Sequence, residues 1–253
     1  MMTNHRTPWV TMLRPGVFFR KILMQKSKVS LYIDGFNIYH RINDYQKKTA
    51  LCYKWLNYRS FFTSLLKTNE EIADIYFFTA ISQDFGFDAV QRHNKYITAL
   101  ESEGIKIIKG YFSKKKKLCR VQGCNFRGNK YFDIREEKQT DINISLSLLK
   151  DAYLKKYDNC FLMSGDNDFA PVLLTIKDLF GISPFLITPP YEPGVVDLKP
   201  IKDLKSACFD QKSKIFNVIN LKFDSFIKHS LPEKIYDSSG NLIVEMPKEY
   251  SQF

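Results

Sequence analysis

The sequence has few of the features that mark secreted or membrane proteins. Its 253 residues include five cysteines, an odd number without the spacing of a disulfide-stabilised secreted domain. Long apolar runs are missing too, because Arg6, Arg14, Arg20 and Lys21 interrupt the first thirty residues and the longest uncharged stretch, 179–191, contains prolines and a glycine. We therefore expect a cytoplasmic protein with no secretion signal, no membrane span and no membrane partner.

Acidic residues are too few to balance the basic ones. The chain has 38 Lys and Arg residues against 27 Asp and Glu residues, so its formal net charge is +11 at pH 7. The hydrophobic fraction of 44% and the charged fraction of 26% are those of a globular protein, and the length fits one large domain or two small ones. The positive charge favours an anionic partner such as nucleic acid or a membrane surface.

Several nucleotide-binding and catalytic motifs are absent as well. The chain contains no GxGxxG, GxxxxGK[ST] or GxSxG motif, so neither a dinucleotide-binding loop, a P-loop nor a serine-hydrolase elbow is supported. Phe36 stands where a haloacid-dehalogenase-type phosphatase needs its second aspartate, and the four histidines lack metal-ligand spacing. Any catalytic chemistry must therefore come from other residues.

From Val29 onward the chain alternates short apolar runs with longer helical segments, a pattern typical of βαβ units around a parallel sheet. The expected strands cover residues 29–33, 74–79, 105–109, 160–164 and 183–187, and the expected helices cover residues 58–66, 87–102, 140–155 and 169–180. We place Thr140 as an N-cap, and Gly104 and Gly181 at helix ends. The pattern predicts an α/β fold.

Carboxylates follow two of the expected strands. Asp34 comes directly after the first strand, Asp166 and Asp168 follow the fourth, and Asp141 lies at the start of the preceding helix. Because ligands bind beyond the carboxyl ends of parallel strands, we expect these side chains to lie together. Clustered carboxylates repel one another unless a cation offsets their charge, so the cluster predicts a phosphoryl hydrolase with Mg²⁺ or Mn²⁺. An isolated aspartate at such a position is equally typical of a turn or a helix cap.

Most of the excess positive charge lies in residues 105–135, which contain ten Lys or Arg residues and one acid, Asp133. Basic residues interleaved with aromatic ones can bind the phosphates and stack on the bases of a single strand, although a lysine run is by default a solvated loop. Both ends of the stretch meet the carboxyl edge of the expected sheet, so we expect it to border the carboxylates. The predicted RNA-binding residues are Lys109, Lys114, Lys115, Lys116, Lys117, Arg120, Arg127, Lys130 and Lys138.

Three segments stand in a characteristic order: DGFNIYH at 34–40, EEKQTDINISLSLLKDAY at 136–153 and FLMSGDNDFAPVL at 161–173. Together they resemble the NYN domain family, LabA-like branch, of the PIN-like nuclease superfamily. The resemblance implies a PIN-like three-layer α/β/α sandwich with a mainly parallel central sheet. On this basis we expect an N-terminal extension at 1–27, a nuclease domain at 28–190 with a basic, Cys-containing insertion at about 110–135, and a C-terminal extension at 191–253 that packs on the domain.

The resemblance also implies a divalent-metal-dependent ribonuclease, which we expect to be an endonuclease that hydrolyses phosphodiester bonds in single-stranded RNA. Asn37 matches the asparagine of the first motif, and Ser164 matches the small hydroxyl residue before the glycine of SGDxD. The implied catalytic residues are Asp34, Asn37, Asp141, Ser164, Asp166 and Asp168, of which the four aspartates are the implied ligands of Mg²⁺ or Mn²⁺.

Two alternatives remain at this point. A non-catalytic, RNA-binding or regulatory NYN-domain protein would use the basic stretch alone. Cys119 and Cys124 resemble a CxxC-type element of one subgroup, but a structural zinc site takes four protein ligands, so we favour a metal-free hairpin or loop. In a homodimer, two copies of the chain could together supply four cysteine ligands to one zinc ion. The oligomeric state stays open.

Overall fold

The computed structural model describes residues 25–81, 86–128, 130–197 and 200–251. Residues 1–24 of the expected N-terminal extension 1–27 therefore lie outside the described residues. A six-stranded sheet forms the centre, in the order β10-β7-β6-β1-β2-β3, and every neighbouring pair is parallel. The strands are β1 Ser27–Asp34, β2 Glu70–Thr79, β3 Lys106–Lys109, β6 Asn159–Met163, β7 Phe185–Ile187 and β10 Val218–Ile219.

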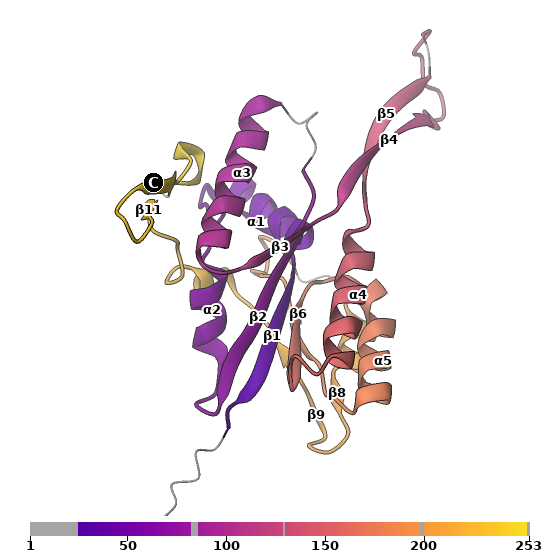
Figure 1. Ribbon diagram of the computed structural model, residues 1–253. Helices are drawn as coiled ribbons and strands as arrows, with labels where there is room; N and C mark the ends of the chain where they lie inside the picture. The colour runs from indigo at the N-terminus through magenta and orange to yellow at the C-terminus, as the bar shows by residue number, and fades with distance from the viewer. Residues whose placement is uncertain (1–24, 82–85, 129, 198–199, 252–253) are drawn as a thin grey trace, which may run out of the picture.

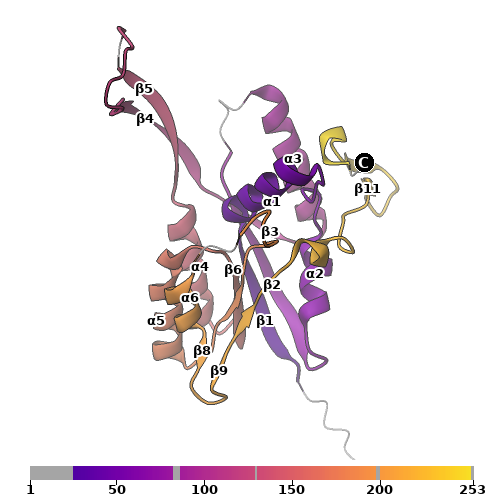
Figure 2. The same cartoon turned by 180° about the vertical axis from the view of Figure 1, so that it is seen from behind.

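Helices cover both faces of the sheet (Figures 1 and 2). One layer consists of α1 Gly35–Thr49, α2 Tyr58–Leu65 and α3 Phe87–Ser102, and the other consists of α4 Thr140–Tyr153, α5 Ala170–Phe180 and α6 Lys202–Ala207. The expected three-layer α/β/α sandwich with a mainly parallel sheet is confirmed.

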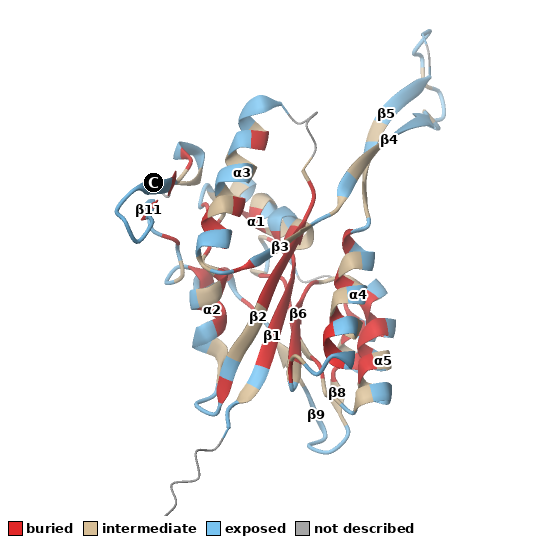
Figure 3. Cartoon of the chain, in the orientation of Figure 1, coloured by how far each residue is buried: buried red, intermediate tan, exposed pale blue. Residues whose placement is uncertain are grey.

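The strands supply one hydrophobic core on each side because successive side chains point to opposite faces. In β1, Leu31 and Ile33 pack in the core beneath α1, α2 and α3, whereas Tyr32 packs in the core beneath α4, α5 and α6. Figure 3 shows the buried residues concentrated on the central strands and the inner sides of the helices. Burial on both faces explains why these strands have nearly continuous apolar sequences.

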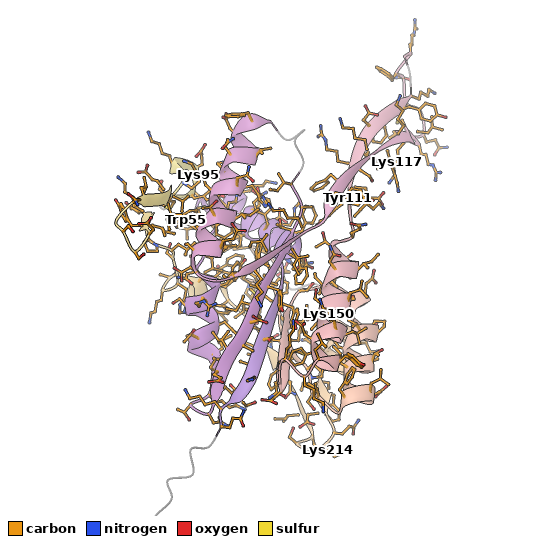
Figure 4. The ribbon with its side chains drawn as sticks, in the orientation of Figure 1. Trp55, Lys95, Tyr111, Lys117, Lys150 and Lys214 are labelled. Atoms are coloured by element: carbon orange, nitrogen blue, oxygen red, sulfur yellow. The ribbon has the colours of Figure 1, made fainter. Side chains whose placement is uncertain are left out.

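The basic stretch forms a long hairpin that projects from the body of the molecule (Figure 1). Its strands, β4 Tyr111–Leu118 and β5 Tyr131–Lys138, pair antiparallel over their full length. In Figure 4, Tyr111 lies near the body and Lys117 lies far out along the arm. Cys119 and Cys124 are free cysteines in the connection between the two strands. The sequence analysis predicted a hairpin or loop here without giving the ranges of its two strands, and the structure shows the hairpin.

The C-terminal residues complete the core instead of forming a separate unit. Phe223 and Phe226, in the short helix η3 Phe223–Phe226, are buried in the core beneath α1 and α2. The Phe223 ring stacks on Tyr45 of α1 at a centroid distance of 3.7 Å, and the Trp55 indole N–H donates to the carbonyl of Pro232 at 2.9 Å. The short elements of this region are β8 Phe209–Asp210, β9 Ile215–Phe216, β11 Lys234–Tyr236, β12 Leu242–Glu245 and η4 Lys248–Tyr250.

Two details differ from the sequence-based expectations. Helix α1 was not predicted, although it is 15 residues long. The placement of Thr140 as an N-cap was wrong, because Gln139, in the left-handed region with φ 71°, holds the cap position. Thr140 is the first helical residue, and its hydroxyl donates to the Glu137 carboxylate. Gly181 ends α5 in the left-handed conformation, as expected.

Within the described ranges, no helix has the length and apolar character needed to cross a membrane.

Candidate active site

Asp34 occupies the centre of the candidate site, at the junction of β1 and α1. Its side chain is buried, with 5% relative exposure. The backbone N–H of Asn37 donates to Asp34 Oδ1 at 3.0 Å, and the Ser164 hydroxyl donates to Oδ2 at 2.7 Å. Burial raises the pKa of Asp34 to about 7, because the loss of solvent outweighs the two hydrogen bonds, and the negative charges of Asp141 and Glu137 raise it further.

A glycine after Asp34 lets α1 begin directly against β2. A Cβ atom on Gly35 would lie 2.4 Å from the Phe77 ring and 2.6 Å from the carbonyl oxygen of Phe78. These distances are too short for any side chain, so the close approach of the two backbones requires glycine. The approach fixes Asp34 at the carboxyl edge of the sheet.

The SGDND loop lies beside Asp34 because β6 pairs with β1, and Ser164 is the first residue after β6. Ser164 links the two strand ends, since its hydroxyl donates to Asp34 and accepts from the backbone N–H of Asp166 at 3.2 Å. Asn37 adds a second link, as its side-chain oxygen accepts from the Gly165 N–H at 3.3 Å. The structure thus joins Asp34, Asn37, Ser164 and Asp166 in one hydrogen-bonded set.

Asp166 also caps the short helix η2 Asn167–Phe169, because its Oδ1 accepts from the Asp168 N–H at 3.0 Å. Asp141 lies in the first turn of α4. Partial desolvation raises the pKa of Asp141, and the negative charges of Asp166 and Asp168 raise it further. These contributions to its pKa indicate that Asp141 lies near the loop that bears Asp166 and Asp168.

The fit of these residues to a divalent ion rests on their chemistry. In the part of the chain that the structure describes, no group of three His, Cys, Asp or Glu side chains is arranged to hold an ion directly. However, Mg²⁺ retains several waters and is usually bound through only one or two carboxylates. Ser164 links the Asp34 carboxylate to the backbone N–H of Asp166, so the two residues that would supply carboxylate ligands belong to one hydrogen-bonded set, and their chemistry suits this ion.

Residues 28–192 match the model of the NYN domain family. The chain belongs to the NYN domain family. The match spans every aspartate of the candidate site and supports a PIN-like, nuclease-type fold. NYN domains are usually ribonucleases, which agrees with the carboxylates at this edge of the sheet. The assignment to the LabA-like branch stays a prediction.

Individual relatives are more distant. The chain is 27% identical over 186 residues to 6-hydroxy-3-succinoylpyridine 3-monooxygenase HspA of Pseudomonas putida; the alignment covers 62% of this chain and 58% of that protein. The chain therefore spans less than two thirds of that relative. A crystal structure of a protein of unknown function from Vibrio parahaemolyticus is similar over 80% of this chain and 96% of the other, with a TM-score of 0.46 and 15% identity.

Glu137 is a residue of the NYN domain site that the sequence analysis did not select. It lies near the end of β5, four residues before Asp141, and its carboxylate accepts the Thr140 hydroxyl. Burial raises the pKa of Glu137, and the charge of Asp141 raises it further. Its charge in turn contributes to the raised pKa of Asp34. The sequence signal was its place in the EEKQTD segment.

The predicted RNA-binding residues are distributed along the hairpin instead of forming one patch. Lys109 ends β3 and Lys138 ends β5, so both lie at the base of the arm. The base is tightly fixed, since a Cβ atom on Gly110 would lie 2.5 Å from both the Lys138 carbonyl oxygen and Thr140 Oγ1. The others lie farther out: Lys114, Lys115, Lys116 and Lys117 along β4, and Arg120, Arg127 and Lys130 in the connection.

Proposed function

We propose that this NYN domain is a divalent-metal-dependent endoribonuclease that cuts single-stranded RNA at Asp34, Asp141, Asp166 and Asp168. One observation carries the proposal: the buried carboxylate of Asp34 is tied through the Ser164 hydroxyl to the loop that bears Asp166. A buried carboxylate surrounded by other negative charges is unfavourable on its own. A cation at this edge of the sheet would offset that cost.

Asp34 and Asp166 would hold Mg²⁺ or Mn²⁺, and Asp141 and Asp168 would contact it through water or help to hold a second ion. When bound, the ion neutralises charge on the phosphate and makes water a nucleophile at neutral pH. In the hydrolysis, a water oxygen bonds to phosphorus while the bond from phosphorus to the 3′ oxygen breaks. The products are a 5′-phosphate and a 3′-hydroxyl.

The other residues of the site position the carboxylates. The Ser164 hydroxyl fixes the rotamer of Asp34 by donating to Oδ2. Asn37 acts twice, because its backbone N–H donates to Asp34 Oδ1 and its side-chain oxygen holds the Gly165 N–H. These contacts keep the SGDND loop against β1. A change at Ser164 or Asn37 is therefore expected to weaken cleavage by loosening the arrangement.

The hairpin would guide the substrate. Lys109 and Lys138 lie at its base, next to the segment that leads into Asp141, and the outer lysines extend the positive charge away from the body. A polyanion approaching an acidic cluster needs such flanking charge. Single-stranded RNA is the favoured substrate, because it can bend towards a recessed carboxylate more easily than a duplex can.

A cleavage assay tests the proposal. We expect an end-labelled single-stranded RNA to be cut internally with Mn²⁺ or Mg²⁺ and to stay intact with EDTA. Asp166→Asn should lower the rate at least ~100-fold, since removal of one stabilising group at a reacting centre commonly costs this much. Asp178→Asn, which changes an exposed carboxylate on α5, is the matched control and should cleave like the wild type.

Two results would contradict the proposal. Intact RNA in the presence of either ion, with structured and unstructured substrates alike, would remove the catalytic role. If Asp166→Asn cleaved RNA as fast as the wild type, the cleavage would come from a contaminating nuclease and not from this site. Salt-sensitive RNA binding without cleavage would instead identify a non-catalytic, RNA-binding NYN-domain protein.

A further inference from the structure

A cavity of about 470 Å³ lies between α1 and α3, beside the candidate active site. Phe36, Tyr39 and Gln46 line it from one face of α1, as their helical spacing requires. His93 lines it from α3, and Phe112 closes it from the base of the hairpin. The two helices flank the point where the hairpin leaves the sheet (Figure 1).

The cavity adjoins Asp34. Gly35 and Phe36 line its wall and directly follow Asp34 in the chain. Tyr58 also lines the cavity, and its raised pKa, caused mainly by burial, includes a contribution from the negative charge of Asp34. The Phe36 ring lies 6.1 Å from the Phe112 ring, so the aromatic wall of the cavity is continuous with the start of the hairpin.

The charged side chains around the cavity are already committed to partners. Arg92 Nη1 pairs with Glu249 Oε1 at 3.0 Å. Lys54 Nζ donates to Asn43 Oδ1 at 2.9 Å and lies 5.1 Å from the centre of the Tyr39 ring. Glu249 therefore offsets the charge of Arg92, whereas the partners of Lys54 hold its ammonium group in place without neutralising it.

The remaining polar groups favour a neutral ligand with an N–H donor. His93 Nε2 lies 3.0 Å from Thr79 Oγ1, and burial lowers the pKa of His93 to about 4, so the ring is neutral at pH 7. Within the described residues, the Gln46 side-chain oxygen is buried and has no hydrogen-bond partner. A buried acceptor without a partner is unfavourable. This oxygen has almost no accessible surface, so an N–H group on a ligand would reach it only after the Gln46 amide rotates towards the cavity.

We propose that this cavity receives one unstacked base of the RNA strand, next to the phosphate that lies over Asp34. The inference rests on the proposed function and adds a base-binding site to it. Flat rings stack well on Phe36, Tyr39 and Phe112, as bases do on aromatic side chains of single-strand-binding proteins. The volume lies in the range of ~300–1,000 Å³ that is usual for small-molecule sites.

The cavity also assigns a base preference. Glutamine pairs with adenine through two hydrogen bonds, accepting from the N6 amino group and donating to N7. With the Gln46 amide rotated towards the cavity, adenine would satisfy its oxygen, whereas uracil presents a carbonyl oxygen in place of the amino group. We expect cleavage beside an adenine to be favoured over cleavage beside a uracil.

Binding measurements with a cleavage-deficient protein test the site. Single-stranded RNAs that each carry one abasic position are titrated against Asp166→Asn with Mg²⁺, and binding is followed by fluorescence anisotropy. We expect one position at which base loss weakens binding ~10-fold, which corresponds to the loss of one stacked base. Adding Phe112→Ala should weaken binding of the RNA without an abasic position by a similar factor, and binding should then no longer depend on where the abasic position lies. Adding Tyr153→Ala, an exposed ring on α4, should change neither.

A second measurement separates this inference from the proposed function. Adenosine and uridine are titrated against the wild type, Gln46→Leu and Phe112→Ala by calorimetry, with circular dichroism to establish that each variant is folded. We expect adenosine to bind the wild type more tightly than uridine does, and Gln46→Leu to remove the difference.

The outcomes are distinct. If RNA is cleaved but every abasic position behaves alike, the base site is wrong and the ribonuclease stands. If adenosine binds in a Phe112-dependent way but no RNA is cleaved, the ribonuclease is wrong and the base site stands. Failure of both nucleosides to bind the folded wild type, together with equal binding of every abasic RNA, would overturn the base site.

Discussion

Replacement of the buried Asp34 carboxylate by an amide should stabilise the metal-free protein at neutral and alkaline pH. The pKa of Asp34 is raised from 3.8 to about 7, mainly by burial. Between these two values the folded chain binds more protons at this site than the unfolded chain does. The free energy of unfolding of the wild type therefore falls as pH rises from about 4 to about 7. Asp34→Asn removes this loss.

The size of the effect follows from the shift. A change from 3.8 to about 7 corresponds to roughly 4 kcal/mol, at ~1.4 kcal/mol per pH unit. The amide lacks the second acceptor oxygen for the Ser164 hydroxyl, which costs about 1 kcal/mol. We therefore expect Asp34→Asn to raise the free energy of unfolding by ~2–4 kcal/mol at pH 8, and to leave it unchanged or slightly lowered at pH 4.

Urea denaturation in EDTA, from pH 4 to pH 8, measures this difference. Asp178→Asn changes an exposed carboxylate and should have a free energy of unfolding within about 0.5 kcal/mol of the wild type throughout. Replacing EDTA with Mg²⁺ should stabilise the wild type but not Asp34→Asn, because an ion that binds only the folded state adds to its stability. A difference that is independent of pH, or a variant less stable than the wild type at pH 8, would refute the reasoning.

Three further predictions concern other parts of the chain. Gly35→Ala should lower the free energy of unfolding by ~1–3 kcal/mol in thermal melts, because its Cβ would lie 2.4 Å from the Phe77 ring. Burial lowers the pKa of His93 to about 4, so below about pH 6.5 the unfolded chain binds more protons than the folded chain and the free energy of unfolding falls on acidification. His93→Gln should therefore reduce the change in the urea midpoint between pH 7 and pH 4.5. Replacing Lys116 and Lys117 with Gln should reduce the slope of log K for RNA against log salt by about 1.4.

The sequence predicted the central strands well, because strands buried on both faces have continuous apolar runs. Helix α1 was missed although its buried residues Ile38, Ile42 and Tyr45 recur at helical spacing among polar ones, so this pattern could have predicted it. For the basic stretch, a hairpin or loop was predicted, but the ranges of β4 and β5 were not. These strands are stabilised by pairing with each other and not by burial, so a lysine run gives no apolar periodicity to detect.

The candidate site was only partly accessible from the sequence. Asp34 and Asp166 stand out because each follows a strand directly, and parallel strands end at one edge. The base-binding cavity could not be found in this way. Its walls combine Phe36, which lies in the DGFNIYH segment, with Tyr250, and these residues are separated by most of the chain. Such a site depends on tertiary packing that no local pattern encodes.

The C-terminal segment makes the folding unit longer than the family match. The match ends at residue 192, yet Phe223 and Phe226 fill the core beneath α1, and β10 pairs with β7. Loss of a buried Phe side chain costs ~3–5 kcal/mol, and a typical domain is stable by only ~5–15 kcal/mol. A chain stopped at residue 192 would also leave β7 as an open edge, which invites aggregation. Expression of the candidate site residues in folded form is therefore expected to require the part of the chain after residue 192, which contains none of them.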